Sequence, residues 1–163
     1  MIYNYYLSLG SNIEPRITYL HRATSFLAQY GVIPRRSSIY QSEPWGETNQ
    51  GRFLNAVIEY RIHLSPREFL ALIKEIEKKV GRLPNRHWGP REIDIDILWS
   101  DHPPINEPDL EIPHPHLFQR RFVLEPLAEL ENQLLIGESR YDISQLLYNC
   151  PDNSRVQKLN MVW

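Results

Sequence analysis

The chain has 163 residues, of which 42% are hydrophobic and 23% are charged. That balance is typical of a globular domain that buries roughly two-thirds of its unfolded surface, and it excludes intrinsic disorder. The formal charge of −2 provides no bulk attraction to nucleic acid or to an anionic membrane. The single cysteine, Cys150, excludes an intramolecular disulfide. With no leader pattern at the N-terminus and no apolar run near the ~20 residues of a membrane span, we expect one cytoplasmic domain over residues 1–163.

The first part of the chain predicts a strand, a helix and a second strand. Residues 3–9 alternate in polarity, as a strand does, and Gly10-Ser11-Asn12 then interrupts the pattern. Helical spacing runs from Pro15, which suits a first turn, to Tyr30, after which Gly31 is placed to end the helix. Residues 32–40 favour a second strand, and a polar loop rich in glycine and proline follows at 42–52.

The next part predicts a strand, a helix and a fourth strand. Residues 53–62 alternate between an apolar face and a mixed face. Ser65-Pro66-Arg67-Glu68 is a capping box ahead of a helix that reaches Val80, and Gly81 ends it. After a basic loop at 82–91, residues 92–99 form a strand. One of its faces carries Asp94 and Asp96, and the other carries Ile93, Ile95, Ile97 and Trp99.

The resulting order, β-α-β-β-α-β, predicts an α+β sandwich of ferredoxin-like type. We expect both helices to cover one face of the sheet and to leave the other face open. Beyond residue 100 proline is frequent and periodicity is weak. That region predicts a loop-rich C-terminal extension with short helices at 123–130 and 143–148.

The pair Asp94 and Asp96 is the feature that points most directly to chemistry. Residues two apart on a strand share a face and lie about 6.6 Å apart. Carboxylate oxygens are the ligands that magnesium prefers, and two such cations about 3.5–4 Å apart would fit between the pair and a polyphosphate. The alternative is that both aspartates are simply the solvent-facing side of an amphipathic strand.

Basic residues flank the pair, and they supply the other half of a phosphoryl-transfer site because guanidinium groups match phosphate oxygens. They are Arg82, Arg86, His87, Arg91, His114, His116, Arg120 and Arg121. Gly10-Ser11-Asn12 is too short for a P-loop and lacks its lysine, so side chains would have to hold ATP. A solvated basic loop is the alternative. Zinc at His114 and His116 is disfavoured, because no cysteine or further histidine lies at ligand spacing.

Aromatic residues suggest a second ligand. Phe53 and Asn55 share the mixed face of 53–62, and Trp45 and Phe122 lie in flanking loops. A flat heterocycle stacked between aromatic rings, with Asn55 bonded to its polar edge, would use such a set. An ordinary hydrophobic cluster explains the same residues equally well.

Five blocks then combine into a family pattern. They are Gly10-Ser11-Asn12, Ser42-Glu43-Pro44-Trp45-Gly46, Phe53-Leu54-Asn55, Trp88-Gly89-Pro90-Arg91-Glu92-Ile93-Asp94-Ile95-Asp96-Ile97-Leu98, and Ile112-Pro113-His114 through Arg120-Arg121-Phe122. In this order, and over nearly the whole chain, they resemble the 6-hydroxymethyl-7,8-dihydropterin pyrophosphokinase family. The chain departs from the family pattern at Lys74, where glutamine is common, and at Pro115, where an aromatic residue is common.

The resemblance implies a ferredoxin-like, monomeric enzyme of tetrahydrofolate biosynthesis. Such an enzyme transfers the diphosphate of ATP to the hydroxymethyl group of the dihydropterin and releases AMP. Its partners would be the small-molecule pterin and ATP, with no nucleic acid and no membrane.

Carried over by position, the resemblance also implies roles for individual residues. Asp94 and Asp96 would bind two Mg²⁺, while Arg82 and Arg91 would meet the charge of the transferring group as mobile loops at 42–52 and 82–91 close. His114 and Arg120 would contact phosphates. The rest of the nucleotide site would be Lys74, Glu77, Arg86, Trp88, Ile97, Leu110, Glu111 and Ile112. The pterin would lie between Phe53 and Phe122, beside Ser42, Pro44, Trp45, Gly46 and Asn55.

Three other functions use some of the same features. The same element order builds RNA-binding domains, in which Tyr5 and Phe53 would stack bases. The aromatic strand signature of those domains is absent, however, and aspartates without a metal repel phosphate. A kinase that moves a single phosphoryl group to another small alcohol would leave ADP instead of AMP. An inactive structural protein is disfavoured because the charged motif residues are all present.

Overall fold

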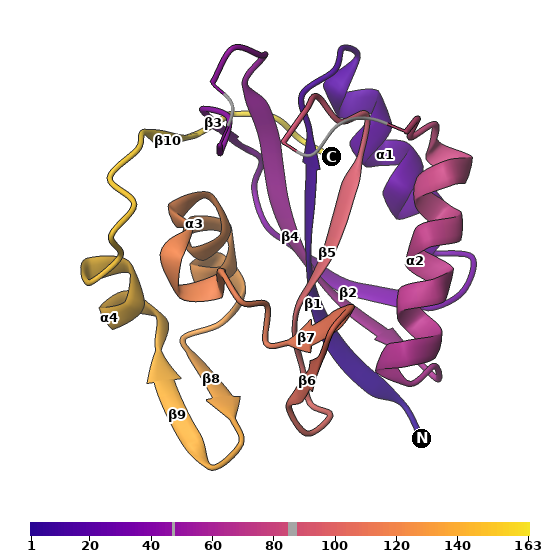
Figure 1. Cartoon of the computed structure of the whole chain (residues 1–163), viewed down its shortest axis with the longest axis vertical. Helices are drawn as coiled ribbons and strands as arrows, with labels where there is room; N and C mark the ends of the chain where they lie inside the picture. The colour runs from indigo at the N-terminus through magenta and orange to yellow at the C-terminus, as the bar shows by residue number, and fades with distance from the viewer. Residues whose placement is uncertain (47, 85–87) are drawn as a thin grey trace.

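The computed structural model describes residues 1–46, 48–84 and 88–163 (Figure 1). Its centre is an antiparallel sheet of six strands in the order β10-β3-β4-β1-β5, with β2 also paired to β4. The strands are β1 (Tyr3–Ser11), β2 (Val32–Arg36), β3 (Tyr40–Ser42), β4 (Phe53–Ile62), β5 (Asp94–Ser100) and β10 (Val156–Lys158).

The helices in the described ranges are α1 (Arg16–Leu27), α2 (Pro66–Val80), α3 (Arg121–Leu130) and α4 (Ile143–Tyr148), with a short 3₁₀ turn at Leu117–Gln119. Two hairpins lie outside the sheet: β6 (Ile105–Glu107) with β7 (Leu110–Ile112), and β8 (Gln133–Ile136) with β9 (Ser139–Asp142). The predicted strands thus lie in the ferredoxin-like order, which confirms the predicted α+β class. Within the described residues no helix is both long and apolar enough to cross a bilayer.

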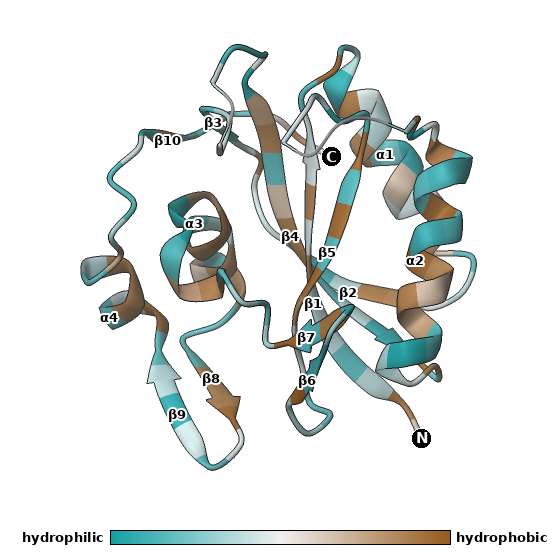
Figure 2. Ribbon diagram, in the orientation of Figure 1, coloured by the Kyte–Doolittle hydropathy of each residue, from teal (hydrophilic) through white to brown (hydrophobic). Residues whose placement is uncertain are grey.

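The helix-side core forms because α1 and α2 each present one apolar stripe to the sheet. The Glu68 carboxylate accepts the Ser65 backbone N–H at 2.9 Å, so the predicted capping box starts α2. Gly81 ends the helix at φ +126°, in a region that favours glycine. The buried stripe of α2, brown in Figure 2, packs on the apolar faces of β1, β4 and β5. Its members are Phe69, Ile73, Ile76 and Val80.

The opposite face of the sheet is only partly open, which corrects the expectation that both helices leave it bare. Helix α3 and the β8–β9 hairpin pack there on Tyr6, Val57 and Leu98 and form a second buried cluster. They do so because α3 also has a buried stripe, which contains Val123, Leu127 and Leu130. The part of this face that α3 does not cover holds the cleft described below.

Two strand predictions are wrong in detail. The expected strand at 32–40 is interrupted at residues 37–39. Ser37 still donates its backbone N–H to the Val57 carbonyl at 2.8 Å, but it accepts the Val57 N–H, at 2.9 Å, with its side-chain hydroxyl. Trp99 was expected beside Ile97, but a bulge inserts Leu98, so Tyr6 pairs with Trp99 and Leu7 with Ile97. Trp99 therefore packs with the second cluster, 5.5 Å from the Tyr6 ring.

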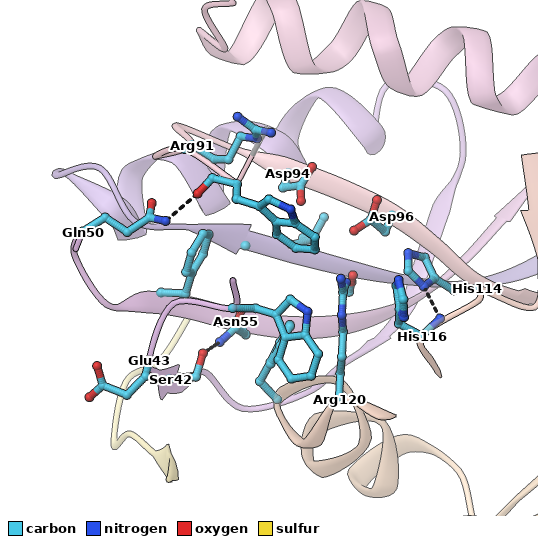
Figure 3. Close-up of a pocket in the computed structure, with 18 of the residues that line it drawn as sticks. Ser42, Glu43, Gln50, Asn55, Arg91, Asp94, Asp96, His114, His116 and Arg120 are labelled. Carbon is cyan, nitrogen blue, oxygen red and sulfur yellow. Dashed lines mark hydrogen bonds between the residues drawn. The ribbon is translucent and has the colours of Figure 1, made fainter. Parts of the chain in front are cut away.

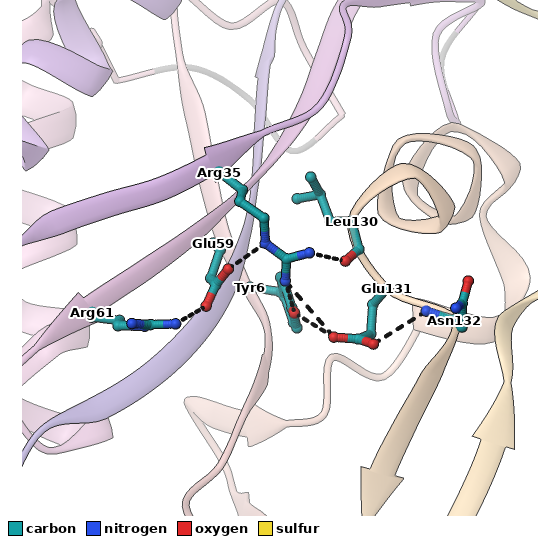
Figure 4. A network of polar contacts seen from close by, with 7 residues as sticks. All are labelled: Tyr6, Arg35, Glu59, Arg61, Leu130, Glu131 and Asn132. Carbon is teal, nitrogen blue, oxygen red and sulfur yellow. Dashed lines mark hydrogen bonds and ion pairs between the residues drawn. The ribbon is translucent and has the colours of Figure 1, made fainter.

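A polar network ties β2 and β4 to α3 (Figure 4). Glu59 is buried and accepts hydrogen bonds from Arg35 at 2.6 Å and from Arg61 at 2.8 Å. Arg35 also donates to the Leu130 carbonyl and, at 3.1 Å, to the Tyr6 hydroxyl. The mixed face of β4 thus pairs its one buried carboxylate with two cations.

Candidate active site

The cleft lies at the end of β1, β4 and β5, and it is bordered by the loops that follow β3 and α2 and by the residues just before and at the start of α3 (Figure 3). Its volume is about 390 Å³. Its lining consists of Ser8, Leu9, Gly10, Ser42, Glu43, Trp45, Gln50, Phe53, Asn55, Trp88, Gly89, Arg91, Asp94, Asp96, His114, Pro115, His116, Arg120 and Phe122.

Asp94 and Asp96 both project from β5 into this cleft because alternate residues of a strand share a face, and their small partners on β1 leave room beside them. Asp94 pairs with Gly10 and Asp96 with Ser8, and Gly10 in turn pairs with Asn55 of β4. A Cβ atom on Gly10 would lie 3.4 Å from the Asn55 side-chain oxygen. Because Gly10 has no side chain, the floor of the cleft is open between the two aspartates and Asn55.

The two aspartates lie in an environment that penalises negative charge. Burial and, second, the Asp96 carboxylate raise the pKa of Asp94 to about 6, against the opposing effects of Arg82, Arg91 and Arg120. Burial and, second, Glu77 likewise raise the pKa of Asp96. A divalent cation would remove this penalty. Within the described ranges no three His, Cys, Asp or Glu side chains gather as a complete metal site. Phosphate and water oxygens would therefore complete the coordination of a magnesium ion here.

Arg120 supplies the complementary charge. Its guanidinium reaches into the cleft and lies 5.4 Å from the ring centre of Trp45 and 5.7 Å from that of Phe122 (Figure 3). In the described part of the chain its buried Nε atom has no hydrogen-bond partner. Burial lowers its pKa, against the opposing effects of Asp96 and Asp94. A buried donor of this kind is expensive without an acceptor, so the arrangement fits an anion bound beside it.

His114 is a neutral hydrogen-bond donor. Burial first, and then Arg120 and His116, lower its pKa to about 4, so the ring is uncharged at neutral pH. The backbone N–H of His116 donates to His114 Nδ1 at 3.1 Å, which places the ring hydrogen on Nε2. His114 can therefore donate one hydrogen bond to an anion without adding charge.

The other end of the cleft is aromatic and amide-lined. Phe53 and Asn55 come from β4, and Ser42 comes from β3. Trp45 lies in the loop after β3, and Phe122 lies in the first turn of α3. The Asn55 amide donates to the Ser42 hydroxyl at 2.6 Å, and both side chains are buried. The geometry suits a flat, polar-edged ring between aromatic faces.

The two loops beside the cleft are joined through Asn12. The Asn12 side-chain amide nitrogen donates to the Gln50 side chain at 2.8 Å, and the side-chain oxygen Oδ1 of Asn12 accepts the Arg91 backbone N–H at 2.7 Å. Gln50 donates to the Trp88 carbonyl at 2.6 Å. A Cβ atom on Gly46, at φ +86°, would lie 2.8 Å from the Trp88 ring, so only glycine permits this close approach.

Several predicted site residues have side chains outside the cleft. Arg82 lies behind Asp94, 3.3 Å from its carboxylate, and donates to Glu77 at 2.7 Å. Glu77 also accepts the Ile95 N–H at 3.0 Å, so it fixes Arg82 to β5. Ile97, Leu110 and Ile112 are buried in the helix-side core, Lys74 and Glu111 are exposed, and Pro44 and Gly46 do not line the cleft. Arg86, like His87, lies outside the described residues.

Sequence reasoning gave no role in the cleft to several lining residues, namely Ser8, Leu9, Gly10, Glu43, Gln50, Gly89 and Pro115, and it named His116 only among the flanking basic residues. Ser8 had a detectable signal, because the alternation in residues 3–9 places it opposite the apolar face. Gln50 had none, since its position depends on Asn12, 38 residues away. Tyr5 is fully buried on the helix side, so it cannot stack a base as the RNA-binding alternative requires.

Comparison with known proteins identifies close relatives of this chain. Residues 6–132 match the model of the 7,8-dihydro-6-hydroxymethylpterin-pyrophosphokinase family. The 2-amino-4-hydroxy-6-hydroxymethyldihydropteridine pyrophosphokinase of Aquifex aeolicus is 45% identical over 130 residues, which is 80% of this chain and 81% of that protein. The Bacillus subtilis protein of the same name is 42% identical over 131 residues, or 79% and 78% of the two chains.

Solved structures with the same fold are more distant in sequence. Plasmodium falciparum HPPK-DHPS with pterin and p-hydroxybenzoate superposes with a TM-score of 0.70 at 15% identity, over 91% of this chain and 42% of that one. An HPPK-DHPS in complex with substrates gives 0.74, also at 15% identity, over 90% and 44%. These structures support the ferredoxin-like α+β fold.

Proposed function

The chain belongs to the 7,8-dihydro-6-hydroxymethylpterin-pyrophosphokinase family, and from that membership we propose how its cleft divides between ATP and the pterin. The activity is diphosphate transfer from ATP to the hydroxymethyl group of 6-hydroxymethyl-7,8-dihydropterin in folate biosynthesis, with AMP as the second product. The observation that carries the division is the row from Asp94 and Asp96 past Gly10 to Asn55, charged at one end and aromatic at the other.

The charged end takes the triphosphate. Asp94 and Asp96 would hold two Mg²⁺, and the buried Arg120 Nε, which has no hydrogen-bond partner among the described residues, would donate with the neutral His114 to phosphate oxygens. When bound, magnesium neutralises the phosphate charge and orients the polyphosphate. Arg91, at the mouth, and Arg82, behind Asp94, meet the charge that develops during transfer.

The nucleotide base is proposed to extend toward β7. Ile97, Leu110 and Ile112 have buried side chains, so their contacts with adenine would come from the backbone. Glu111, Lys74 and Trp88 would border the nucleotide from the surface, and Glu77 would act through Arg82.

The aromatic end takes the pterin. Phe53 and Phe122 stack on its two faces, while the buried Asn55 and Ser42 bond its polar edge. Trp45 and the backbone at Pro44 and Gly46 close the slot. In this pose the hydroxymethyl oxygen faces Asp94 and Asp96, and the reacting groups meet between the two ends of the cleft.

The chemistry then follows from position. The hydroxymethyl oxygen bonds to the β-phosphorus as the bond from that phosphorus to the α,β-bridging oxygen breaks, and AMP leaves while the hydroxyl proton passes to solvent. Water must be excluded, because it would compete as the acceptor. We propose that the monomer is the working unit, because residues of a single chain already supply both the charged and the aromatic end of the cleft.

Product analysis tests this function. The protein is incubated with magnesium, ATP and 6-hydroxymethyl-7,8-dihydropterin, and the nucleotides are separated by chromatography. AMP in a one-to-one ratio with the pterin diphosphate ester supports the proposal. ADP would support the single-phosphoryl kinase alternative, and ATP consumption that does not depend on the pterin would refute the assignment of the aromatic slot.

A further inference from the structure

The pterin end of the cleft depends on a very short strand. β3 contains only three residues, and it carries Ser42, which accepts the Asn55 hydrogen bond. β4 lies on one side of β3, and β10 lies on the other. Val156 of β10 pairs directly with Ser42, and Lys158 pairs with Tyr40. Without β10, β3 would be a three-residue edge strand, which frays easily.

The segment Val156–Trp163, here named the C-terminal strap, contacts the residues that precede Ser42 in the chain, from Arg36 to Gln41. The Leu159 N–H donates to the Ile39 carbonyl at 2.8 Å. The Trp163 indole N–H donates to the Ser37 carbonyl at 2.8 Å, and the Arg36 guanidinium lies 5.3 Å from the centre of an indole ring of Trp163. The strap thus spans the break between β2 and β3, and Figure 1 shows it as the yellow end of the chain, which runs from β10 past β3 to the C-terminus.

The anchoring contacts are not those of a loose tail. Trp163 is partly buried against the helix-side core, and its ring also lies 6.5 Å from that of His21 on α1. The Lys158 ammonium lies 3.9 Å from Glu129 of α3. The strap also lies entirely outside residues 6–132, the part of the chain that matches the family model. Whatever it contributes is additional to what that model describes.

We propose that the C-terminal strap is a positioning element for pterin binding, with Trp163 as its principal anchor. It holds β3 so that Ser42 and Asn55 already have the geometry of the bound state, which lowers the conformational cost of binding the pterin. The proposal rests on the assignment of the pterin to the Asn55 end of the cleft. Within the described residues, the strap's hydrogen bonds and its ion pair join it to residues 37–42 and to the C-terminal half of α3, whereas β5, which carries Asp94 and Asp96, lies at the opposite edge of the sheet.

Three variants of the full chain test the strap. Trp163→Ala removes both the ring contact and the hydrogen bond, and Trp163→Phe keeps an aromatic ring but loses the N–H donor. Val162→Ala is the matched control, because that neighbouring side chain is 97% exposed. Circular dichroism establishes that each variant is folded at the assay temperature. Calorimetry then gives separate dissociation constants for the pterin and for a non-hydrolysable ATP analogue with magnesium, and steady-state assays give kcat and the pterin KM.

We expect Trp163→Ala to raise the pterin Kd and KM about 10-fold, the equivalent of one net hydrogen bond. Trp163→Phe should show a smaller rise and Val162→Ala none, while kcat at saturating pterin and the nucleotide Kd stay unchanged. Unaltered pterin affinity in a folded Trp163→Ala variant, or an equal loss of pterin and nucleotide affinity, would overturn the proposal. If Trp163→Ala does not fold, Trp163→Phe decides, and wild-type pterin affinity in it is then the refuting result. If the wild-type protein forms AMP and both Trp163 variants bind the pterin as wild type does, the strap proposal alone is refuted. If the wild-type protein binds no pterin, both the strap proposal and the proposed function are refuted.

Discussion

Asp94 and Asp96 are held close together in a setting that raises the pKa of both carboxyl groups. Their side chains point into the cleft and not into a core, so truncation opens no cavity in packed structure. We therefore expect Asp94→Ala and Asp96→Ala each to lower kcat by about 1,000-fold or more, because a bound metal contributes several kcal/mol to the transition state. Thermal unfolding without magnesium should be unchanged or shifted upward, since a like-charge repulsion is removed.

The matched control is Glu75→Ala, which removes an exposed carboxylate from α2. Magnesium with an ATP analogue should raise the melting temperature of wild type and of this control, but of neither aspartate variant. A near-wild-type rate in Asp94→Ala or Asp96→Ala at low magnesium would remove the basis for the metal assignment.

Asn55 offers a similarly local test at the other end of the cleft. Its amide is buried and bonded to Ser42, so removing it leaves polar groups of the site and of the ligand unpaired. We expect Asn55→Ala to weaken pterin binding by about 1–3 kcal/mol, or roughly 5- to 150-fold, with little change in ATP binding. Calorimetry with each ligand measures the two effects separately. Equal losses for both ligands would contradict this placement of the pterin.

At the scale of elements, the Glu59 network makes a prediction about pH. Burial raises the pKa of Glu59, but the hydrogen bonds and charges of Arg35 and Arg61 outweigh that effect and leave it below its ordinary value of 4.5. A lowered pKa in the folded state contributes stability above the unfolded value, and that contribution is lost as pH falls through the folded value. Glu59→Gln should therefore cost about 1–3 kcal/mol at pH 7, because Arg35 and Arg61 lose a charged acceptor and one of its two oxygens is replaced by an NH2 group that cannot accept.

Urea unfolding of wild type and Glu59→Gln between pH 7 and pH 3 measures this difference. The difference between their free energies of unfolding should be constant near neutral pH and should shrink as pH falls below 4.5. A gap that is independent of pH would mean that the ionisation of Glu59 does not connect β2, β4 and α3 as described.

The loop that follows α2 makes a kinetic prediction. Arg82 is already paired with Glu77 and lies beside Asp94, while Arg91 lines the mouth of the cleft. If both residues act mainly on charge that develops during transfer, Arg82→Ala and Arg91→Ala should lower kcat by about 100-fold or more. The affinity for an ATP analogue should change little. Loss of nucleotide affinity in proportion to rate, in stopped-flow binding and single-turnover assays, would show that the arginines serve ground-state binding instead.

The elements also show which features sequence could predict. The predicted strand at 53–62 and the predicted helix ending at Val80 agree closely with β4 and α2. The alternation of the strand, and the capping box and terminal glycine of the helix, are local signals that sequence alone displays. The orientation of Trp99 could not be predicted, since the bulge at Leu98 is set by pairing with β1. β10 was missed for the same reason: its three residues form a strand only because β3 offers an open edge.

For the molecule as a whole, the sequence predicted a charged end and an aromatic end but not their relation. Asp94, Gly10 and Asn55 are distant in the chain and become neighbours only through the register of β5, β1 and β4. The partial cover of the second sheet face by α3 was also a tertiary outcome, and it confines the site to one end of the sheet. The cleft and its two-ended character therefore emerge from topology, while the chemical types of its residues are visible in the sequence.

A structure of the protein crystallised with magnesium, a non-hydrolysable ATP analogue and 6-hydroxymethyl-7,8-dihydropterin tests the central claim most directly. We predict metal density about 2.1 Å from carboxylate oxygens of both Asp94 and Asp96. The pterin should lie between Phe53 and Phe122, with its hydroxymethyl oxygen facing the β-phosphorus. Metal bound away from both aspartates, or a pterin outside the Phe53–Phe122 slot, would contradict the account.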